Sequence, residues 1–171
     1  SARSFLTSGL RAFCMFCLLL SQASPAAIND NQIQALFPKA TRIEPKQERP
    51  PVYSVYQLDE LLGYAFESND YSNLQGFSGK PIRLLIGMDP QGVLSGVRVV
   101  EHHEPVFLHG LGEQALFDFV EQYRQQDIST PIVVGGRQAE TVDGTSITQF
   151  DGVSKATVSV VILNETVLIA A

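Results

Sequence analysis

Tryptophan is absent from this chain of 171 residues, and cysteine occurs only twice. Both cysteines, Cys14 and Cys17, lie inside an apolar run near the N-terminus. If that run belongs to a cleaved leader, the remaining chain has no cysteine and can form neither a disulfide nor a cysteine-ligated metal cluster. Any redox chemistry would then depend on a bound cofactor.

The N-terminal segment has the pattern of a secretory signal peptide. Arg3 and Arg11 precede an apolar run from Ala12 to Leu20, and small residues follow as far as Ala27. The run is shorter than the roughly 18 to 20 residues that a membrane-spanning helix needs. We therefore expect residues 1–27 to be a signal peptide and the rest of the chain to be exported.

Basic residues are few. The chain has 12 Lys and Arg against 18 Asp and Glu, which gives a formal charge of −6. It therefore lacks the basic footprint of a nucleic-acid-binding protein, and it has no basic amphipathic segment typical of a membrane-surface helix. The length, and a hydrophobic content of 44%, are typical of one folded domain.

The segment after the leader predicts a short helix and a connector. A polar stretch at residue 29 precedes apolar positions spaced for a helix, which Pro38 ends. Residues 39–51 carry mixed charges, show no periodicity and close with two prolines. We assign 28–51 to this helix and connector, and 52–171 to the main domain.

The main domain begins with patterns typical of β-hairpins. Residues 52–56 and 61–66 are rich in aromatic and branched side chains, with an acidic turn at residues 59–60. Residues 82–88 and 93–100 form a second pair, joined by a turn that contains Pro90 and Gly92. An amphipathic helix is predicted over 113–123. Strands followed by helices indicate an α+β fold with a mostly antiparallel sheet packed with helices.

A threonine near the C-terminus lies in a distinctive sequence motif. Asp151, Ser154, Ala156 and Thr157 match the pattern Asp-x-x-Ser/Thr-Gly-Ala-Thr, with Lys155 at the glycine position. This pattern resembles the flavin-attachment motif of the FMN-binding domain family. The resemblance implies that the phosphate of FMN is esterified to Thr157 by a separate flavin transferase, which takes FMN from FAD.

The physical chemistry of a helix start fits this role. Unpaired amides and the helix dipole favour a phosphate at a helix N-terminus. A lysine ammonium can pair with that anion, although lysine adopts a positive φ less readily than glycine. An ordinary helix start with a serine cap is the alternative explanation of the same residues.

A second motif adds support and narrows the resemblance. The wider family has a loop reading His-x-Glu-Thr-Pro-Gly-Leu-Gly near the flavin, and both of its ends are found here, separated by an insertion. The matching residues are His102, His103, Glu104, Pro105, Gly110, Leu111 and Gly112. The His-His-Glu-Pro form, together with residues 63–66 and 76–81, resembles the NosR/NirI family. We expect His103, Glu104 and Gly110 to Gly112 to join residues 151 and 154–157 at the cofactor.

The resemblance also implies a biological setting. In the NosR/NirI family the FMN domain is periplasmic and N-terminal, and transmembrane helices and cytoplasmic iron-sulfur motifs follow it. The whole protein supports the expression, maturation and electron supply of nitrous oxide reductase in denitrification. The expected partners are therefore that transmembrane iron-sulfur part, the flavin transferase, and nitrous oxide reductase or its maturation factors. We expect this chain to be a fragment of such a protein.

The C-terminal segment is ambiguous by local rules. Its β-branched residues favour strands, whereas the resemblance implies a helix that begins at the threonine. A helix capped by Ser154 would bury Val158, Val161, Ile162 and Leu168, and we predict this helix.

Two alternative functions remain open. One is a flavin-free binding or sensing domain, which keeps the fold but has lost flavin attachment because of Lys155. The other is an exported metal-binding module that uses His102, His103 and His109. The first two histidines are adjacent, and on an extended strand they would face opposite sides.

Overall fold

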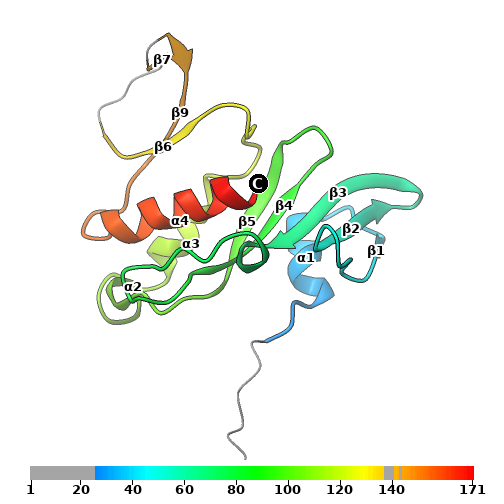
Figure 1. Cartoon of the computed structure of the whole chain (residues 1–171), viewed down its shortest axis with the longest axis horizontal. Coiled ribbons are helices and arrows are strands. Elements are labelled where there is room, and N and C mark those ends of the chain that lie inside the picture. The colour runs from blue at the N-terminus through cyan, green and yellow to red at the C-terminus, as the bar shows by residue number, and fades with distance from the viewer. Residues whose placement is uncertain (1–25, 137–140, 143) are drawn as a thin grey trace, which may run out of the picture.

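The computed structural model describes residues 26–136, 141–142 and 144–171 (Figure 1). The predicted signal peptide, apart from its last two residues, and both cysteines lie outside the described residues. No helix in the described part of the chain is both long enough and apolar enough to cross a membrane.

The centre of the molecule is a five-stranded antiparallel sheet with its strands in chain order. The strands are β1 (Arg42–Ile43), β2 (Val52–Gln57), β3 (Glu60–Glu67), β4 (Arg83–Met88) and β5 (Leu94–Glu101). Both predicted hairpins are confirmed. The turn of the first one lies at Leu58 and Asp59, one residue earlier than predicted. Strand β1 lies in the predicted connector, and two residues are too short to produce a readable pattern.

Strand β4 is buried on both faces of the sheet. Leu84 and Ile86 belong to the larger hydrophobic core, whereas Leu85 belongs to a smaller core with Ile33 and Leu36. Ile33 and Leu36 lie on α1 (Asp30–Leu36). This helix begins with reciprocal hydrogen bonds between Asn29 and Gln32. The predicted first helix is confirmed, and it covers one face of the sheet.

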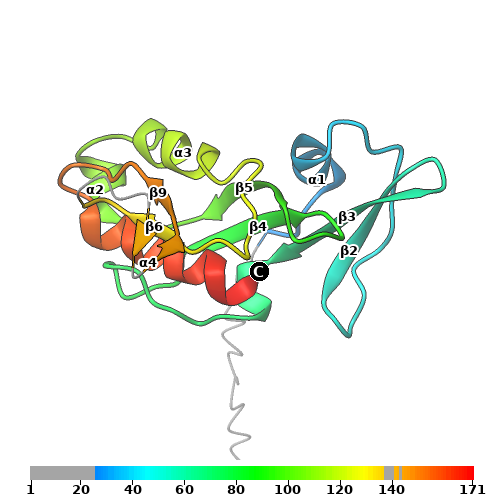
Figure 2. The ribbon, with the colours of Figure 1, turned by 90° about the horizontal axis from the view of Figure 1, so that it is seen from above.

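In the described part of the chain, three further helices follow the sheet. They are α2 (Pro105–His109), α3 (Gln114–Glu121) and α4 (Thr157–Ala170), and a short 3-10 turn, η1 (Ser68–Asp70), follows β3. Figures 1 and 2 show α2, α3 and α4 gathered at one end of the molecule, with α1 and the β2–β3 hairpin at the other. The predicted helix over 113–123 is confirmed as α3, and the α+β fold with a mostly antiparallel sheet is confirmed.

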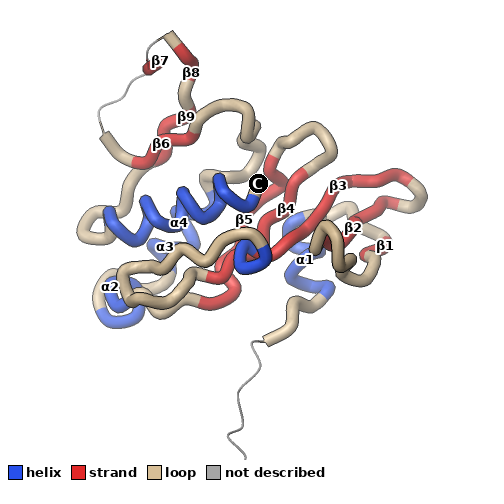
Figure 3. Tube along the Cα trace, in the orientation of Figure 1, coloured by secondary structure: helices blue, strands red, loops and turns tan. Residues whose placement is uncertain are grey.

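The described residues between α3 and α4 include four short strands. Strands β6 (Ile132–Val134) and β9 (Thr148–Phe150) pair in parallel, and β7 (Thr141–Val142) pairs with β8 (Thr145–Ser146). Figure 3 shows that β7 and β8 are the part of this segment farthest from the central sheet. These strands were not predicted, because segments of two or three residues show no periodicity.

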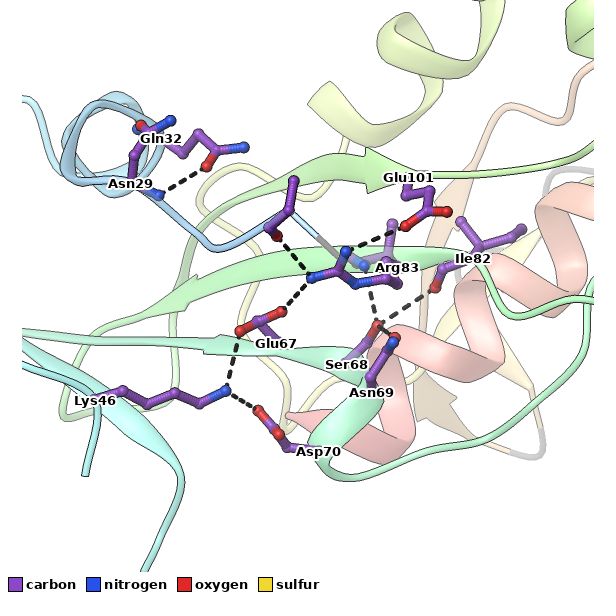
Figure 4. A network of polar contacts seen from close by, with 12 residues as sticks. Asn29, Gln32, Lys46, Glu67, Ser68, Asn69, Asp70, Ile82, Arg83 and Glu101 are labelled. Carbon is purple, nitrogen blue, oxygen red and sulfur yellow. Dashed lines mark hydrogen bonds and ion pairs between the residues drawn. The ribbon is translucent and has the colours of Figure 1, made fainter. Parts of the chain in front are cut away.

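A network of ion pairs joins the connector to the sheet (Figure 4). Lys46 Nζ lies 3.0 Å from Glu67 Oε1 and 2.7 Å from Asp70 Oδ2. Arg83 lies 2.8 Å from the other Glu67 oxygen and 3.2 Å from Glu101. Burial alone would raise the pKa of Glu67, but hydrogen bonds from Arg83 and Lys46 outweigh it and hold the pKa below its ordinary value.

Helix α4 forms as predicted, but its buried face is not the predicted one. Val160, Leu163 and Val167 are fully buried. Of the four residues predicted to be buried, Val158 and Val161 are exposed, whereas Ile162 and Leu168 are half-buried and Leu168 packs against the larger core. The prediction followed the branched residues and overlooked the polar ones. Ser159, Asn164 and Thr166 are buried on this helix, and each forms a hydrogen bond. Asn164, for example, accepts from Tyr123 Oη at 2.8 Å and donates to the Ile132 carbonyl at 3.1 Å.

Candidate functional site

A tight turn sets the start of α4. The Ala156 amide donates to the Val153 carbonyl at 3.0 Å, and between them Lys155 has a φ of 68°, in the left-handed region. A φ of this sign is the reason glycine suits the third position of such a turn. The structure therefore places Lys155 in the conformation that the commoner glycine would adopt.

Ser154 lies in this turn and does not cap the helix, so the predicted cap is wrong. Ala156 occupies the N-cap position, and no side chain accepts a hydrogen bond from the first turn. The turn at Lys155 brings an alanine, with no hydroxyl, to the position where a serine would act. The first amides of α4 consequently have no side-chain acceptor, which suits binding of an anion.

Thr157 is the first residue of α4, and it is exposed. It opens onto a pocket of about 280 Å³, just below the roughly 300 Å³ at which typical ligand pockets begin. The pocket therefore encloses a ligand only in part. Its lining residues are Phe77, Val106, Lys155, Ala156, Thr157, Val158 and Ser159.

Glu104 lies behind this pocket and is fully buried. Its carboxylate accepts hydrogen bonds from the amides of Phe77 and Ser78, both at 3.2 Å, and from the Ser159 hydroxyl. A Cβ atom on Gly76 would collide with the Glu104 carboxylate, so only glycine fits there. Glu104 thus joins the 76–81 loop to the first turn of α4.

The two adjacent histidines bond to different carboxylates. The Nδ1 atom of His102 accepts from the Glu104 amide at 3.3 Å, so its Nε2–H donates to Glu113 at 3.0 Å. The Nε2 atom of His103 lies 3.0 Å from Glu101. Both histidines follow the end of β5 and are not on a strand, contrary to the geometry considered from the sequence. Within the described residues, no group of three or more His, Cys, Asp or Glu side chains could hold a metal ion.

The glycine pair of the second motif shapes the chain between α2 and α3. Gly110 ends α2, and a Cβ atom there would lie only 2.7 Å from the Val106 carbonyl. Leu111 donates its amide to that same carbonyl, and Gly112 has a φ of 85°. These residues set the course of the backbone beside the pocket, and Leu111 stays 41% exposed.

Asp151 is held through its backbone and not through its carboxylate. Its amide donates to Gln122 Oε1 at 2.7 Å, and its carbonyl accepts from Gln122 Nε2 at 3.1 Å. Gln122 immediately follows α3, so these bonds join the approach to α4 to that helix.

The structure brings together only part of the predicted set. Lys155, Ala156 and Thr157 line the pocket, whereas the residues that do not line it are His103, Glu104, Gly110, Leu111, Gly112, Asp151 and Ser154. From the sequence, no role at the cofactor was assigned to Phe77, Val106, Val158 or Ser159, and Val158 was expected on the buried face of the C-terminal helix. A serine at a buried helix position was the available signal for Ser159, and Phe77 lies between two glycines of a motif that had already been noted.

Comparison with known proteins gives one family match and several relatives. The model of the FMN-binding domain matches residues 76–170. Regulatory protein NosR of Stutzerimonas stutzeri is 35% identical over 155 residues, which is 91% of this chain and 21% of the relative. Protein NirI of Paracoccus denitrificans is 30% identical over 153 residues, or 88% of this chain and 21% of the relative.

A more distant relative belongs to the ion-translocating oxidoreductase complex of Haemophilus influenzae, of which it is one subunit. It is 33% identical over 101 residues, which is 59% of this chain and 46% of that protein. The chain spans about a fifth of the length of the NosR and NirI proteins it matches.

Proposed function

Because this chain belongs to the FMN-binding domain family, we propose that it is a periplasmic electron-transfer domain that carries FMN covalently on Thr157. The matches with NosR and NirI confirm the resemblance predicted from the motifs. The bond to Thr157 would be a phosphoester, and the flavin would supply the one- and two-electron chemistry that protein side chains lack.

The observation that carries the proposal is the position of the Thr157 hydroxyl. It lies on the first residue of an uncapped helix, where amides and the dipole favour a phosphate. Lys155 lines the same pocket and supplies a positive charge to pair with the phosphodiester. Phe77, Val106 and Val158 supply apolar surface suited to an isoalloxazine ring. The residues present therefore fit FMN.

The pocket also explains why a transferase would be needed. Among the described residues that line it, there is no carboxylate or imidazole to deprotonate the Thr157 hydroxyl. In the proposed transfer, Thr157 Oγ1 bonds to the flavin-side phosphorus of FAD, and the bond from that phosphorus to the AMP oxygen breaks. AMP leaves, and the hydroxyl proton passes to a base of the transferase.

A covalent link suits the proposed location. A flavin lost outside the cytoplasm is not easily replaced, and a tether removes that loss. The further partners we propose are a transmembrane iron-sulfur part of a longer protein, and nitrous oxide reductase or its maturation factors. The name of the Haemophilus relative, which places it in an oxidoreductase complex, supports electron transfer as the shared task.

The test is expression with export and a flavin transferase, followed by denaturing electrophoresis and in-gel flavin fluorescence. The wild-type chain should fluoresce, and Thr157→Val should not. The matched control is Thr166→Val, the same change at a buried position further along α4. The control should keep its fluorescence, because Thr166 is far from the first turn of the helix.

The outcome also separates the alternatives. A wild-type chain without fluorescence in the presence of the transferase would indicate the flavin-free binding or sensing domain. Fluorescence that persists in Thr157→Val would place the attachment elsewhere. The metal-binding module has less support, because the hydrogen bonds of His102 and His103 go to two different carboxylates.

A further inference from the structure

Phe77 combines an exposed ring with a restrained backbone. It lies in the 76–81 loop, and it is 68% exposed although it is one of the largest apolar side chains of the protein. A phenylalanine this exposed removes little apolar surface from water, so its ring contributes little to stability through burial. Phe77 is one of the residues that line the pocket onto which Thr157 opens.

The backbone under this ring is held from the core. The Phe77 amide donates to Glu104 Oε2 at 3.2 Å, and the next amide donates to Glu104 Oε1 at 3.2 Å. The same carboxylate accepts from Ser159, two residues after Thr157. The loop closes on itself as well, because the Gly76 amide donates to the Lys80 carbonyl at 2.8 Å. One buried group therefore sets the position of Phe77 relative to Thr157.

We infer that Phe77 is the residue that stacks against the isoalloxazine ring of the flavin, and that Glu104 is the positioning residue that holds it there. This inference rests on the proposed function, since it takes the flavin to be tethered at Thr157. Phe77 and Thr157 line one pocket, so a flavin attached to Thr157 lies against Phe77 when its ring system enters the pocket. Aromatic rings in such contact prefer offset or edge-to-face stacking.

The stacking would have two measurable consequences. Phe77 would shield one face of the flavin from solutes such as iodide, which quenches flavin fluorescence by collision. It would also keep water from a ring that gains negative charge on reduction, and an apolar neighbour disfavours that charge. Removing the ring should therefore raise the midpoint potential of the flavin.

The experiment uses the flavin-loaded, exported chain and compares Phe77→Ala with Phe117→Ala. Phe117 is a matched control because it lies on α3, is 40% exposed and does not line the Thr157 pocket. Covalent loading is first measured on denaturing gels, so that every later value is expressed per attached flavin. The iodide quenching constant, corrected for fluorescence lifetime, and the midpoint potential are then measured on the native proteins.

The expected result is a several-fold larger quenching constant and a higher potential in Phe77→Ala, with both values unchanged in Phe117→Ala. Phe77→Tyr, which keeps a ring, should restore the wild-type potential. Equal quenching and equal potential in Phe77→Ala and wild type would overturn the stacking role even if Thr157 carries the flavin.

The proposal that Thr157 carries the flavin and the proposal that Phe77 stacks on it can fail separately. If the wild-type chain carries no covalent flavin, the attachment proposal fails, and FMN is titrated into the same variants. Phe77→Ala must then bind FMN more weakly than Phe117→Ala. Equal binding by the two variants would overturn the inference.

Discussion

Ser159 of α4 donates a hydrogen bond to the buried carboxylate of Glu104, and this contact joins the C-terminal helix to a loop that precedes it by many residues. The other bonds of the carboxylate go to the amides of Phe77 and Ser78. A buried carboxylate is tolerated only when its oxygens have partners, and here three donors provide them. The relationship places the loop, the helix start and Thr157 in one assembly.

Replacement of Glu104 should be among the most destabilising single changes in this protein. Glu104→Ala leaves two partly buried amides and a buried serine hydroxyl without their acceptor, and we expect a loss of about 3 kcal/mol in the free energy of unfolding. Glu104→Gln keeps one carbonyl acceptor and should lose less. Urea unfolding followed by circular dichroism measures both variants.

The control for Glu104 is Glu113→Ala. The carboxylate of Glu113 is 52% exposed and accepts one hydrogen bond, from His102, whose own side chain is 4% exposed. Its loss should change the unfolding free energy by less than about 1 kcal/mol. Equal losses for the two alanine variants would contradict the role assigned to the buried carboxylate.

Lys155 should be replaceable by glycine with a gain in stability. Its φ of 68° costs a residue with a Cβ roughly 1 to 2 kcal/mol, and glycine adopts this conformation freely. Part of that gain is offset because glycine makes the unfolded chain more flexible, so we expect Lys155→Gly to be more stable by about 1 kcal/mol. Thermal unfolding measures the change.

Lys155→Ala distinguishes the effect of the backbone conformation at this position from the effect of the lysine charge. Alanine removes the ammonium and keeps the Cβ, so it should not gain stability. If Lys155 also pairs with the flavin phosphate, both variants should lower the rate of flavin attachment by the transferase in the same assay. A stabilised alanine variant would argue against backbone strain at this position.

The corrected face of α4 is tested by two identical substitutions on neighbouring residues. Val160 is fully buried and Val161 is 39% exposed. Val160→Ala removes two buried methyl groups and leaves a small cavity, so we expect a loss of about 2 kcal/mol. Val161→Ala should stay within about 0.5 kcal/mol of wild type. A larger loss of unfolding free energy for Val161→Ala than for Val160→Ala would instead support the buried face predicted from the sequence.

The ion-pair network of Glu67 predicts acid sensitivity. Its pKa in the folded state lies below the ordinary value of 4.5, because hydrogen bonds from Arg83 and Lys46 outweigh the opposing effect of burial. The stabilisation is therefore complete above the pKa of the unfolded chain and is lost as the pH falls through the lower, folded value. Unfolding free energies measured from pH 6 downward should show this loss.

Glu67→Gln should flatten that pH dependence and lower stability near neutral pH by about 1 kcal/mol. Glu60→Gln is the control, since Glu60 is an exposed glutamate at the start of the same strand. That variant should retain the wild-type pH profile. An unchanged profile in Glu67→Gln would show that other carboxylates govern acid unfolding.

The elements that could be predicted are those whose signal is local. The polar stretch that begins at Asn29 marked the start of α1, and the turn with Pro90 and Gly92 marked the hairpin of β4 and β5. Strand β1 and the strands between α3 and α4 were missed because pairing with distant segments, and not their own pattern, makes them strands. The family was readable because several motifs occur in order along the chain.

The candidate site was only partly predictable. Thr157 and Lys155 were found because they are neighbours in a motif, and the positive φ at the lysine agrees with the glycine that the motif prefers. Ser154 was misassigned as a cap because its distance from the helix depends on the turn that the lysine makes. Phe77 was not found because it is far from Thr157 along the chain.

By itself, the sequence determined the α+β class, the family and the threonine at a helix start, since periodicity, turn chemistry and motifs act over a few neighbouring residues. Only the tertiary structure decided which face of α4 is buried and which residues surround Thr157. Those outcomes depend on a buried carboxylate, Glu104, whose oxygens need donors, and the fold supplies these from two distant segments.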